Sequence, residues 1–404
     1  MRLRDNAVAV SLVLAMALVA VLLVGCPKVP PIEPGEVPPP EDITPAPTGE
    51  PIKIGGIFGM TGAAAALGQP EADTAKMIEE QVNAAGGIDG RPLQIIIRDT
   101  KGDETECLAA VKELVEKENV LAIAGPSRSG TTLGIIDYIE KAEVPLLSCA
   151  AAVKITTPVH KWVFKTPQTD ADAVKRIYQY LGEKSINKVA VLSASSAFGV
   201  AGLEQLKAQA EAAGITIVAE EQFQDSDTDM TAQLTRIKGT DAQAVIGWGI
   251  GPAPALVCKN MKQLEMTIPL IQSHGVANMR FIEDAGDAAN GVVLPAGKLL
   301  VADQLPNDDP QKSVLMESKQ QYEEKYQQPA DTFGGHAWDA IQLILKGIRE
   351  GGTDRAAIRD VIESTQGFVG IGGVFNYSPE DHYGLTPDAF VMIKIVDGQW
   401  QLAD

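Results

Sequence analysis

From residue 51 onward, short apolar runs alternate with segments whose apolar residues recur at helical spacing. The apolar runs predict strands, and Gly86 with Gly87 predicts the end of a helix. The expected strands are IKIGGIF (52–58), LQIIIRD (93–99), VLAIAG (120–125) and VPLLS (144–148). The expected helices span about 70–84, 104–117 and 130–141. This alternation is typical of a parallel sheet covered by helices.

The same alternation restarts after residue 187. The expected strands are KVAVLS (188–193), ITIVAE (215–220), AVIGWG (244–249), IPLIQ (268–272) and GVVLP (291–295), with helices near 198–213, 229–238, 252–264 and 277–285. Two similar α/β units in tandem are therefore expected. A helical block at about 310–364 follows and is expected to pack back on the first unit. The chain closes with a β-hairpin whose turn is Asp397-Gly398.

The N-terminal segment differs from the rest of the chain. Arg2 and Arg4 precede an unbroken run of small apolar residues at 7–24, as in a secretory signal. The run ends in Leu-Val-Gly-Cys, which resembles the bacterial lipoprotein signal. We therefore expect a signal peptide over 1–26 with a lipidated Cys26; an uncleaved membrane anchor is the alternative. The proline-rich residues 27–50 are expected to form an extended tether.

The composition mainly excludes some classes of partner and binding site. A chain of 404 residues is long enough for two globular units with extensions. Its 34 basic and 53 acidic residues give a net charge of −19, and without a basic stripe we expect no nucleic-acid partner. Cys107, Cys149 and Cys258 lack CxxC spacing, and a single disulfide between two of them is an alternative to three free thiols. The four histidines lack metal-ligand spacing, so we expect neither a metal nor a cofactor.

Small and polar residues follow several of the predicted strands. In an open parallel sheet, ligands lie beyond the carboxyl ends of the strands. These positions hold Ser127–Ser129 and Cys149–Ala152 in the first unit. In the second unit they hold Ser195–Phe198, Trp248 and His274. If the two sheet edges face each other, these residues line a cleft between the units.

The sequence of the loop GPSRSGTT (125–132) distinguishes between phosphate binding, nucleophilic catalysis and anion binding. It lacks the Lys-Ser/Thr of a phosphate-binding loop, and it is not G-x-S-x-G with a marked base and acid. We therefore expect no catalytic residues and no enzyme. Ser129 stands where a helix is expected to begin, and backbone N–H groups there favour an anion such as a carboxylate. A simple helix cap by Ser129 is the alternative, and the two roles are compatible.

The run IKIGGIFGMTGAAAALGQPEADTAKMIEEQVNAAGGIDGRPLQIIIRDTKGDE resembles the opening of the leucine/isoleucine/valine-binding protein family. These are the type I periplasmic solute-binding proteins of ABC importers. Phrases such as AGPSRSGTT, VPLLSCAAAVKIT and KVAVLSASSAFG extend the resemblance over nearly all of 51–404. It implies two Rossmann-like lobes, each a parallel-type sheet flanked by helices, joined by three crossovers. The implied N-terminal lobe is 51–167 plus 297–386, and the C-terminal lobe is 168–296 plus 387–404.

The resemblance also implies binding residues where the motifs match. Ser129 is implied to hold a ligand carboxylate, and the backbone of Ala150, Ala151 and Ala152 to meet the carboxylate and ammonium of the ligand. Phe198 and Trp248 are implied as walls. His274 stands where amino-acid-binding members carry an acid for the ammonium, and Ala152 stands where the family often has a threonine.

These two departures leave the ligand open. An ammonium held in a closed cleft without an acidic partner is strongly disfavoured. Either Asp99, Asp170 or another acid takes that role, or the ligand is an amino-free acid such as an aromatic carboxylate. A position of His274 just outside the pocket is the alternative.

The resemblance implies an extracytoplasmic substrate-binding lipoprotein of a branched-chain amino-acid-type ABC importer. It would capture an apolar amino acid or related carboxylic acid by closure of two lobes. The implied partners are an ABC permease with its ATPases and a bacterial membrane that holds the lipid anchor. The protein is expected to be a monomer on the periplasmic or extracellular face. A ligand-sensing module of the same fold is the alternative.

Overall fold

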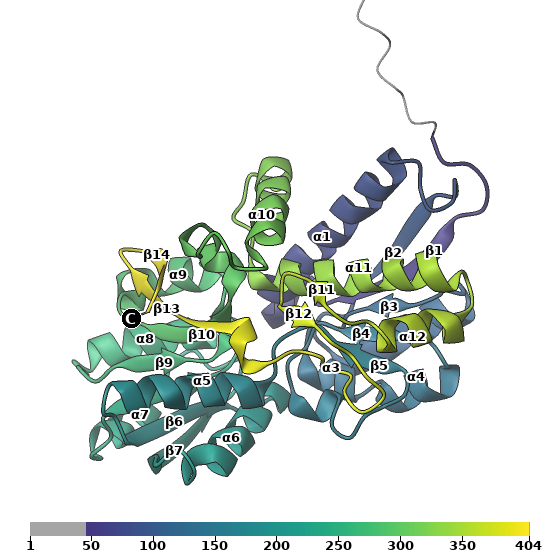
Figure 1. Ribbon diagram of the computed structural model, residues 1–404. Helices are drawn as coiled ribbons and strands as arrows, with labels where there is room; N and C mark the ends of the chain where they lie inside the picture. The colour runs from purple at the N-terminus through teal and green to yellow at the C-terminus, as the bar shows by residue number, and fades with distance from the viewer. Residues whose placement is uncertain (1–45, 404) are drawn as a thin grey trace, which may run out of the picture. The chain divides into compact units, whose positions relative to one another are not determined.

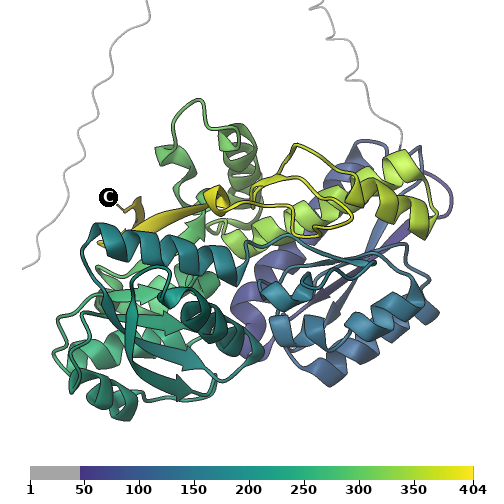
Figure 2. The same ribbon diagram turned by 60° about the horizontal axis from the view of Figure 1, so that its bottom comes forward.

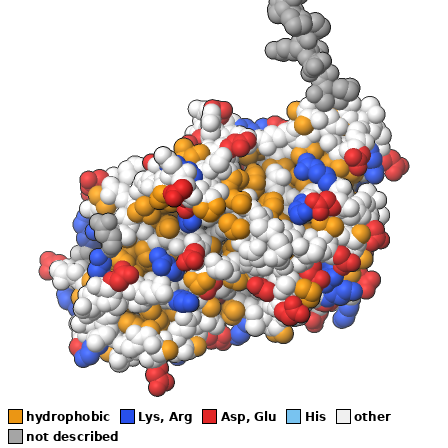
Figure 3. Space-filling view, viewed as in Figure 1, with side chains coloured by type: hydrophobic (Ala, Val, Ile, Leu, Met, Phe, Trp, Pro, Cys, Tyr) orange, Lys and Arg blue, Asp and Glu red, His pale blue; other side chains and the backbone are white. Residues whose placement is uncertain are grey.

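The computed structural model describes residues 46–403, which form two α/β lobes (Figures 1 and 2). The expected signal peptide with Cys26 and most of the expected tether lie outside the described residues. Within 46–403, none of the helices has the length and apolar character needed to cross a membrane. Acidic and basic side chains are interspersed on the face of both lobes shown in Figure 3.

The first lobe is built on a five-stranded sheet in the order β2-β1-β3-β4-β5, in which all neighbouring strands are parallel. Its strands are β1 (Ile52–Phe58), β2 (Leu93–Asp99), β3 (Ile123–Ala124), β4 (Leu146–Ser148) and β5 (Val163–Lys165). Its connecting helices are α1 (Ala65–Ala84), α2 (Glu104–Glu116), α3 (Ser129–Leu133) and α4 (Ile136–Ala142). The central strands are buried on both faces because helices cover the two sides of the sheet.

The second lobe contains a seven-stranded sheet in the order β14-β13-β10-β9-β8-β6-β7. Its strands are β6 (Lys188–Ala194), β7 (Thr216–Phe223), β8 (Ala244–Trp248), β9 (Leu270–Gln272), β10 (Val293–Gly297), β13 (Phe390–Val396) and β14 (Gln399–Leu402). Its helices are α5 (Asp170–Glu183), α6 (Ala197–Ala210), α7 (Thr231–Lys238), α8 (Ala253–Gln263) and α9 (Met279–Ala285). The predicted hairpin forms β13 and β14, and β13 joins the sheet antiparallel to β10.

The chain passes between the lobes three times, after β5, after β10 and after β12. The segment between the last two passages contains α10 (Lys312–Tyr326), α11 (Thr332–Gly351), α12 (Arg355–Glu363), β11 (Phe368–Val369) and β12 (Val374–Phe375). As expected, this block returns to the first lobe, where α11 and α12 share a core with β1 and α1 (Figure 1). Short 3-10 segments are η1 (Gly62–Ala64), η2 (Val153–Ile155), η3 (His274–Val276), η4 (Gly286–Ala289), η5 (Lys298–Gln304) and η6 (Pro387–Ala389).

Two regions differ from the sequence-based expectation. The single helix expected over 130–141 is wrong, because the structure breaks it into α3 and α4. The break falls at Gly134 and Ile135, and Gly134 is a poor helix former. No element was expected between 149 and 187, where the structure has β5 and α5.

Candidate functional site: a cleft between the lobes

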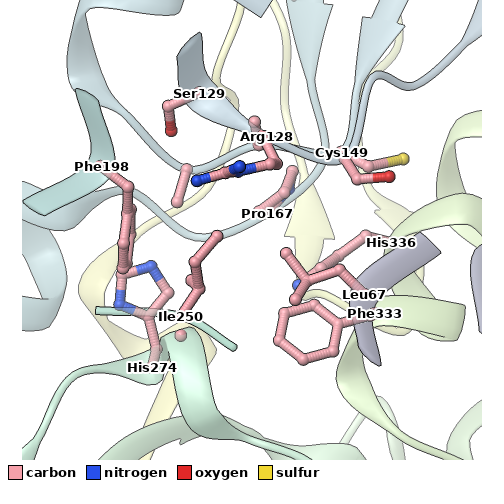
Figure 4. A pocket seen from close by; sticks show the side chains of 14 residues that line it. Leu67, Arg128, Ser129, Cys149, Pro167, Phe198, Ile250, His274, Phe333 and His336 are labelled. Atoms are coloured by element: carbon pink, nitrogen blue, oxygen red, sulfur yellow. The ribbon is translucent and has the colours of Figure 1, made fainter. Parts of the chain in front are cut away.

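A cavity of about 30 Å³ lies between the lobes, beyond the carboxyl ends of their parallel strands (Figure 4). The first lobe, including α11, and the second lobe both contribute to its lining. The lining residues are Leu67, Ser127, Arg128, Ser129, Cys149, Ala150, Ala151, Pro167, Phe198, Ile250, His274, Gly275, Phe333 and His336. Because both lobes line the cavity, separation of the lobes would widen it.

Five of the seven binding residues predicted from the sequence share this cavity. They are Ser129, Ala150, Ala151, Phe198 and His274. The other two, Ala152 and Trp248, are fully buried and do not line it. Ring centroids place Trp248 5.9 Å from both Phe198 and His274, so it supports the wall instead of forming it. Its indole packs over Gly202 of α6, where any Cβ would collide with the ring.

The Ser129 hydroxyl points into the cavity (Figure 4), and the residue as a whole is only 3% exposed. Its Oγ accepts the Ala152 N–H at 3.3 Å, which leaves its own proton free to donate elsewhere. Among residues 46–403 we find no acceptor for the Ala151 N–H, whereas the Ala150 N–H donates to Ser148 Oγ at 3.1 Å. Since α3 has only five residues, the donors that this loop offers to an anion are the Ser129 hydroxyl and the Ala151 N–H, and not a helix dipole.

Two imidazoles, from η3 and α11, face the same cavity (Figure 4). Both ring nitrogens of His274 and Nδ1 of His336 are buried without a hydrogen-bond partner among the described residues. Burial lowers the pKa of each histidine to about 3, assisted by the nearby positive charge of Lys165. At neutral pH both rings are therefore uncharged, and each has a donor and an acceptor nitrogen.

The two acids considered from the sequence lie in different places. Asp99 accepts the N–H groups of Met60 and Lys101 and the hydroxyl of Thr61, and it does not line the cavity. Asp170, the first residue of α5, is fully buried behind His274, with Oδ1 3.9 Å from its Nε2. Neither carboxyl oxygen of Asp170 has a hydrogen-bond partner among the described residues, and burial raises its pKa to about 7.

Apolar side chains make up much of the rest of the lining. These side chains are Leu67, Pro167, Phe198, Ile250 and Phe333. The Phe198 ring meets the His274 ring edge to face, with centroids 5.4 Å apart. A Cβ at Gly275 would lie 2.5 Å from the Gly249 oxygen, so glycine is required for this close approach of η3. The site therefore suits a small apolar body with polar groups at its ends.

His336, Phe333 and Ile250 were not identified from the sequence as binding residues, whereas Arg128 was among the residues expected to line the cleft. Ile250 lies two residues after Trp248, so loop position was an available signal for it. His336 and Phe333 lie inside a helix of the C-terminal block, and only tertiary packing brings them to the cleft. No group of three or more His, Cys, Asp or Glu side chains within 46–403 is arranged to hold a metal ion.

Comparison with known proteins covers both lobes. A family model described as "Periplasmic binding protein" matches residues 51–399. The leucine-, isoleucine-, valine-, threonine- and alanine-binding protein of Pseudomonas aeruginosa is 27% identical over 303 residues, which are 74% of this chain and 79% of that protein.

Solved structures of similar sequence share the fold. An extracellular ligand-binding receptor from Rhodopseudomonas palustris HaA2 has a TM-score of 0.83 at 27% identity, covering 88% of this chain and 100% of the other. A branched-chain amino acid transporter substrate-binding protein from Streptococcus pneumoniae, in complex with isoleucine, has a TM-score of 0.79 at 26% identity. That match covers 88% of this chain and 99% of the other.

Proposed function

Because this chain belongs to the periplasmic binding protein family, we propose that it captures a small apolar carboxylate for an ABC importer of the branched-chain amino-acid type. One observation carries the ligand class. The Ser129 hydroxyl and the Ala151 N–H are buried donors with no acceptor among the described residues, and both residues line the largely apolar cavity. A carboxylate accepts both bonds and gains charge assistance.

An apolar amino acid is the first candidate ligand, because the similar proteins named above include an isoleucine complex and a leucine-, isoleucine- and valine-binding protein. Its ammonium group would need a negative charge close to His274 and His336. Asp170 is the acid nearest to His274 there, and it stands one layer behind the lining.

An amino-free carboxylate is the second candidate, and the lining itself favours it. The described residues around the cavity include no Asp or Glu, while His274 and His336 face it as neutral imidazoles. A carbonyl or hydroxyl group on the ligand would satisfy their unpartnered nitrogens without bringing a positive charge into the cleft.

The cellular context belongs to the same proposal. The apolar run at 7–24 before Cys26 supports a lipid anchor on a bacterial membrane, and the proline-rich residues 27–50 support a tether. The permease and ATPases of the importer are the proposed partners. A sensing role without transport is the alternative, and the absence of neighbouring permease and ATPase genes would favour it.

Thermal unfolding with a ligand panel tests the proposal. The panel comprises L-leucine, L-isoleucine, 4-methyl-2-oxopentanoate and benzoate. A carboxylate present at about 100 times its Kd is expected to stabilise the folded protein by about 2.7 kcal/mol. Stabilisation by 4-methyl-2-oxopentanoate but not by L-leucine would select the amino-free class. A panel without any stabilising carboxylate would contradict the proposed ligand chemistry.

A further inference from the structure

Lys165, the last residue of β5, is fully buried directly behind the Ala150–Ala152 loop. Its ammonium donates to the Ala151 carbonyl at 2.7 Å and lies 3.5 Å from the Ala152 carbonyl oxygen. The ring centroid of Tyr383 is 4.8 Å from the same nitrogen. A buried ammonium destabilises the fold unless hydrogen bonds and charges compensate it. The buried position of Lys165 therefore suggests that this residue has a function in the site.

The peptide between Ala151 and Ala152 connects Lys165 to Ser129. Its carbonyl oxygen accepts from Lys165, and its N–H donates to Ser129 Oγ at 3.3 Å. A cation at the oxygen polarises the amide and strengthens the N–H as a donor. Because this N–H occupies one lone pair of the hydroxyl, it also limits the directions in which Ser129 can donate its proton.

We propose that Lys165 is a positioning residue for carboxylate recognition. Through the Ala151 carbonyl it holds the anion-binding loop, and through the same peptide it orients the Ser129 hydroxyl toward the ligand. Its positive charge also stands behind the point where the ligand carboxylate is held. The inference rests on the proposed function, and it predicts that the site distinguishes an ionised carboxylate from its neutral amide.

The charged and titratable groups around Lys165 come from four parts of the fold. They are Asp170 and Asp172 of α5, His274 of η3, His336 of α11, and Asp381 with Tyr383 after β12. The three carboxyl groups favour the ammonium form, but burial outweighs them and lowers the pKa of Lys165 to about 8. Lys165 is therefore cationic at neutral pH and loses its charge as the pH rises through this value.

This titration predicts that carboxylate affinity decreases in mildly alkaline solution. Burial also raises the pKa of Asp170, and the negative charge that appears when Asp170 loses its proton acts in the same direction. Substitution of Lys165 by arginine separates the two effects because a guanidinium stays protonated. Lys165→Arg is expected to keep only the part of the pH dependence that comes from Asp170.

The experiment measures Kd by calorimetry for L-leucine, 4-methyl-2-oxopentanoate and benzoate, each beside its primary amide. The full chain is compared with Lys165→Met, Lys165→Arg and Lys141→Met, an exposed control on α4. Lys165→Met is expected to raise the carboxylate Kd by about tenfold to a hundredfold, since the Ala151 carbonyl loses its cationic donor and the Ser129 hydroxyl is no longer oriented. The amide Kd is expected to change far less, and in a Ser129→Ala background the loss is expected to shrink.

The outcomes separate this inference from the proposed function. A wild-type protein that binds no carboxylate better than its amide contradicts both. A wild-type preference that Lys165→Met leaves unchanged contradicts the role of Lys165 alone, and so do equal losses for carboxylate and amide. Should Lys165→Met fail to fold, Lys165→Gln takes its place, and an unchanged preference for carboxylate over amide in that variant overturns the inference.

Discussion

The Arg128 guanidinium pairs with the Asp225 carboxylate across the two lobes, with Nη2 and Oδ2 2.5 Å apart. Arg128 precedes Ser129 in the anion-binding loop of the first lobe, and Asp225 follows β7 in the second. Their side chains are 18% and 19% exposed, so the pair is largely shielded from solvent. Separation of the lobes breaks this contact, which therefore favours the closed state of the cleft.

Removal of this ion pair is expected to weaken ligand binding without touching the ligand. For Asp225→Asn we expect the Kd of the tightest carboxylate in the panel to rise by about threefold to tenfold, because closure loses a partly buried charge pair. Glu204→Gln is the matched control, since it breaks the interlobe pair of Lys154 and Glu204, which is 55% and 46% exposed. Exposed pairs contribute little, so calorimetry that finds equal effects for both variants would contradict the role of Asp225.

Ser129→Ala is expected to weaken carboxylate binding by about tenfold or more, because the ligand loses a buried charge-assisted hydrogen bond. The unfolding free energy is expected to fall by only about 1 kcal/mol, since the Ala152 N–H loses its acceptor. Calorimetry and urea unfolding measure the two effects. Thr131→Ala is the control: it removes a neighbouring hydroxyl that donates to the Arg128 carbonyl and does not line the cavity. The cap considered from the sequence is wrong, because Ser129 is the first residue of α3 and its side chain does not cap the helix. Parallel losses of binding in both variants would therefore indicate that Ser129 acts on the loop structure and not on the ligand.

The architecture was accessible from the sequence because helix and strand periods differ clearly along most of this chain. The α3–α4 break was not predicted, because a glycine such as Gly134 weakens a helix without fixing where the helix ends. The segment containing β5 and α5 was missed, although the acidic residues Asp170 and Asp172 in the first turn of α5 were available as a signal.

Within the site, residues in loops after parallel strands were predictable because such loops converge at one sheet edge. Trp248 shows the limit of that rule. It is the last residue of β8, and its side chain packs on Gly202, while Ile250, two residues later, reaches the cavity. His336 shows a second limit, because its helix reaches the cleft only by packing against α1.

His274→Glu is expected to change which ligands the cleft prefers. A carboxylate at this position would pair with an ammonium and repel a second anionic group, so the ratio of the Kd values for 4-methyl-2-oxopentanoate and L-leucine should rise. We expect a change of about tenfold or more in this ratio, by analogy with a partly buried charge contact. His274→Gln is the neutral control. An unchanged ratio in His274→Glu would place residue 274 outside the contact surface of the ligand.

The two buried imidazoles are expected to make the protein less stable in mild acid. Burial lowers the pKa of His274 and His336 from 6.5 to about 3, so between these values the unfolded chain binds more protons than the folded one. The free energy of unfolding therefore falls as the pH decreases through this window. Each histidine contributes a slope of up to about 1.4 kcal/mol per pH unit.

Replacement of both histidines by glutamine isolates this contribution. Burial raises the pKa of Asp331 to about 7 and that of Asp339 to about 8, so these two groups make the folded protein more stable as the pH falls. Because the wild type and the double variant both contain them, their effect cancels in the comparison. Urea unfolding of the wild type and the double variant between about pH 4 and pH 6.5 is expected to show a smaller acid loss in the variant. Data at about pH 8 supply the control, because both imidazoles are then neutral in the folded and the unfolded chain. An equal dependence of the unfolding free energy on pH in the two proteins would mean that both rings protonate as readily in the folded chain as in the unfolded one. The assignment of His274 and His336 as neutral at mildly acidic pH would then be wrong.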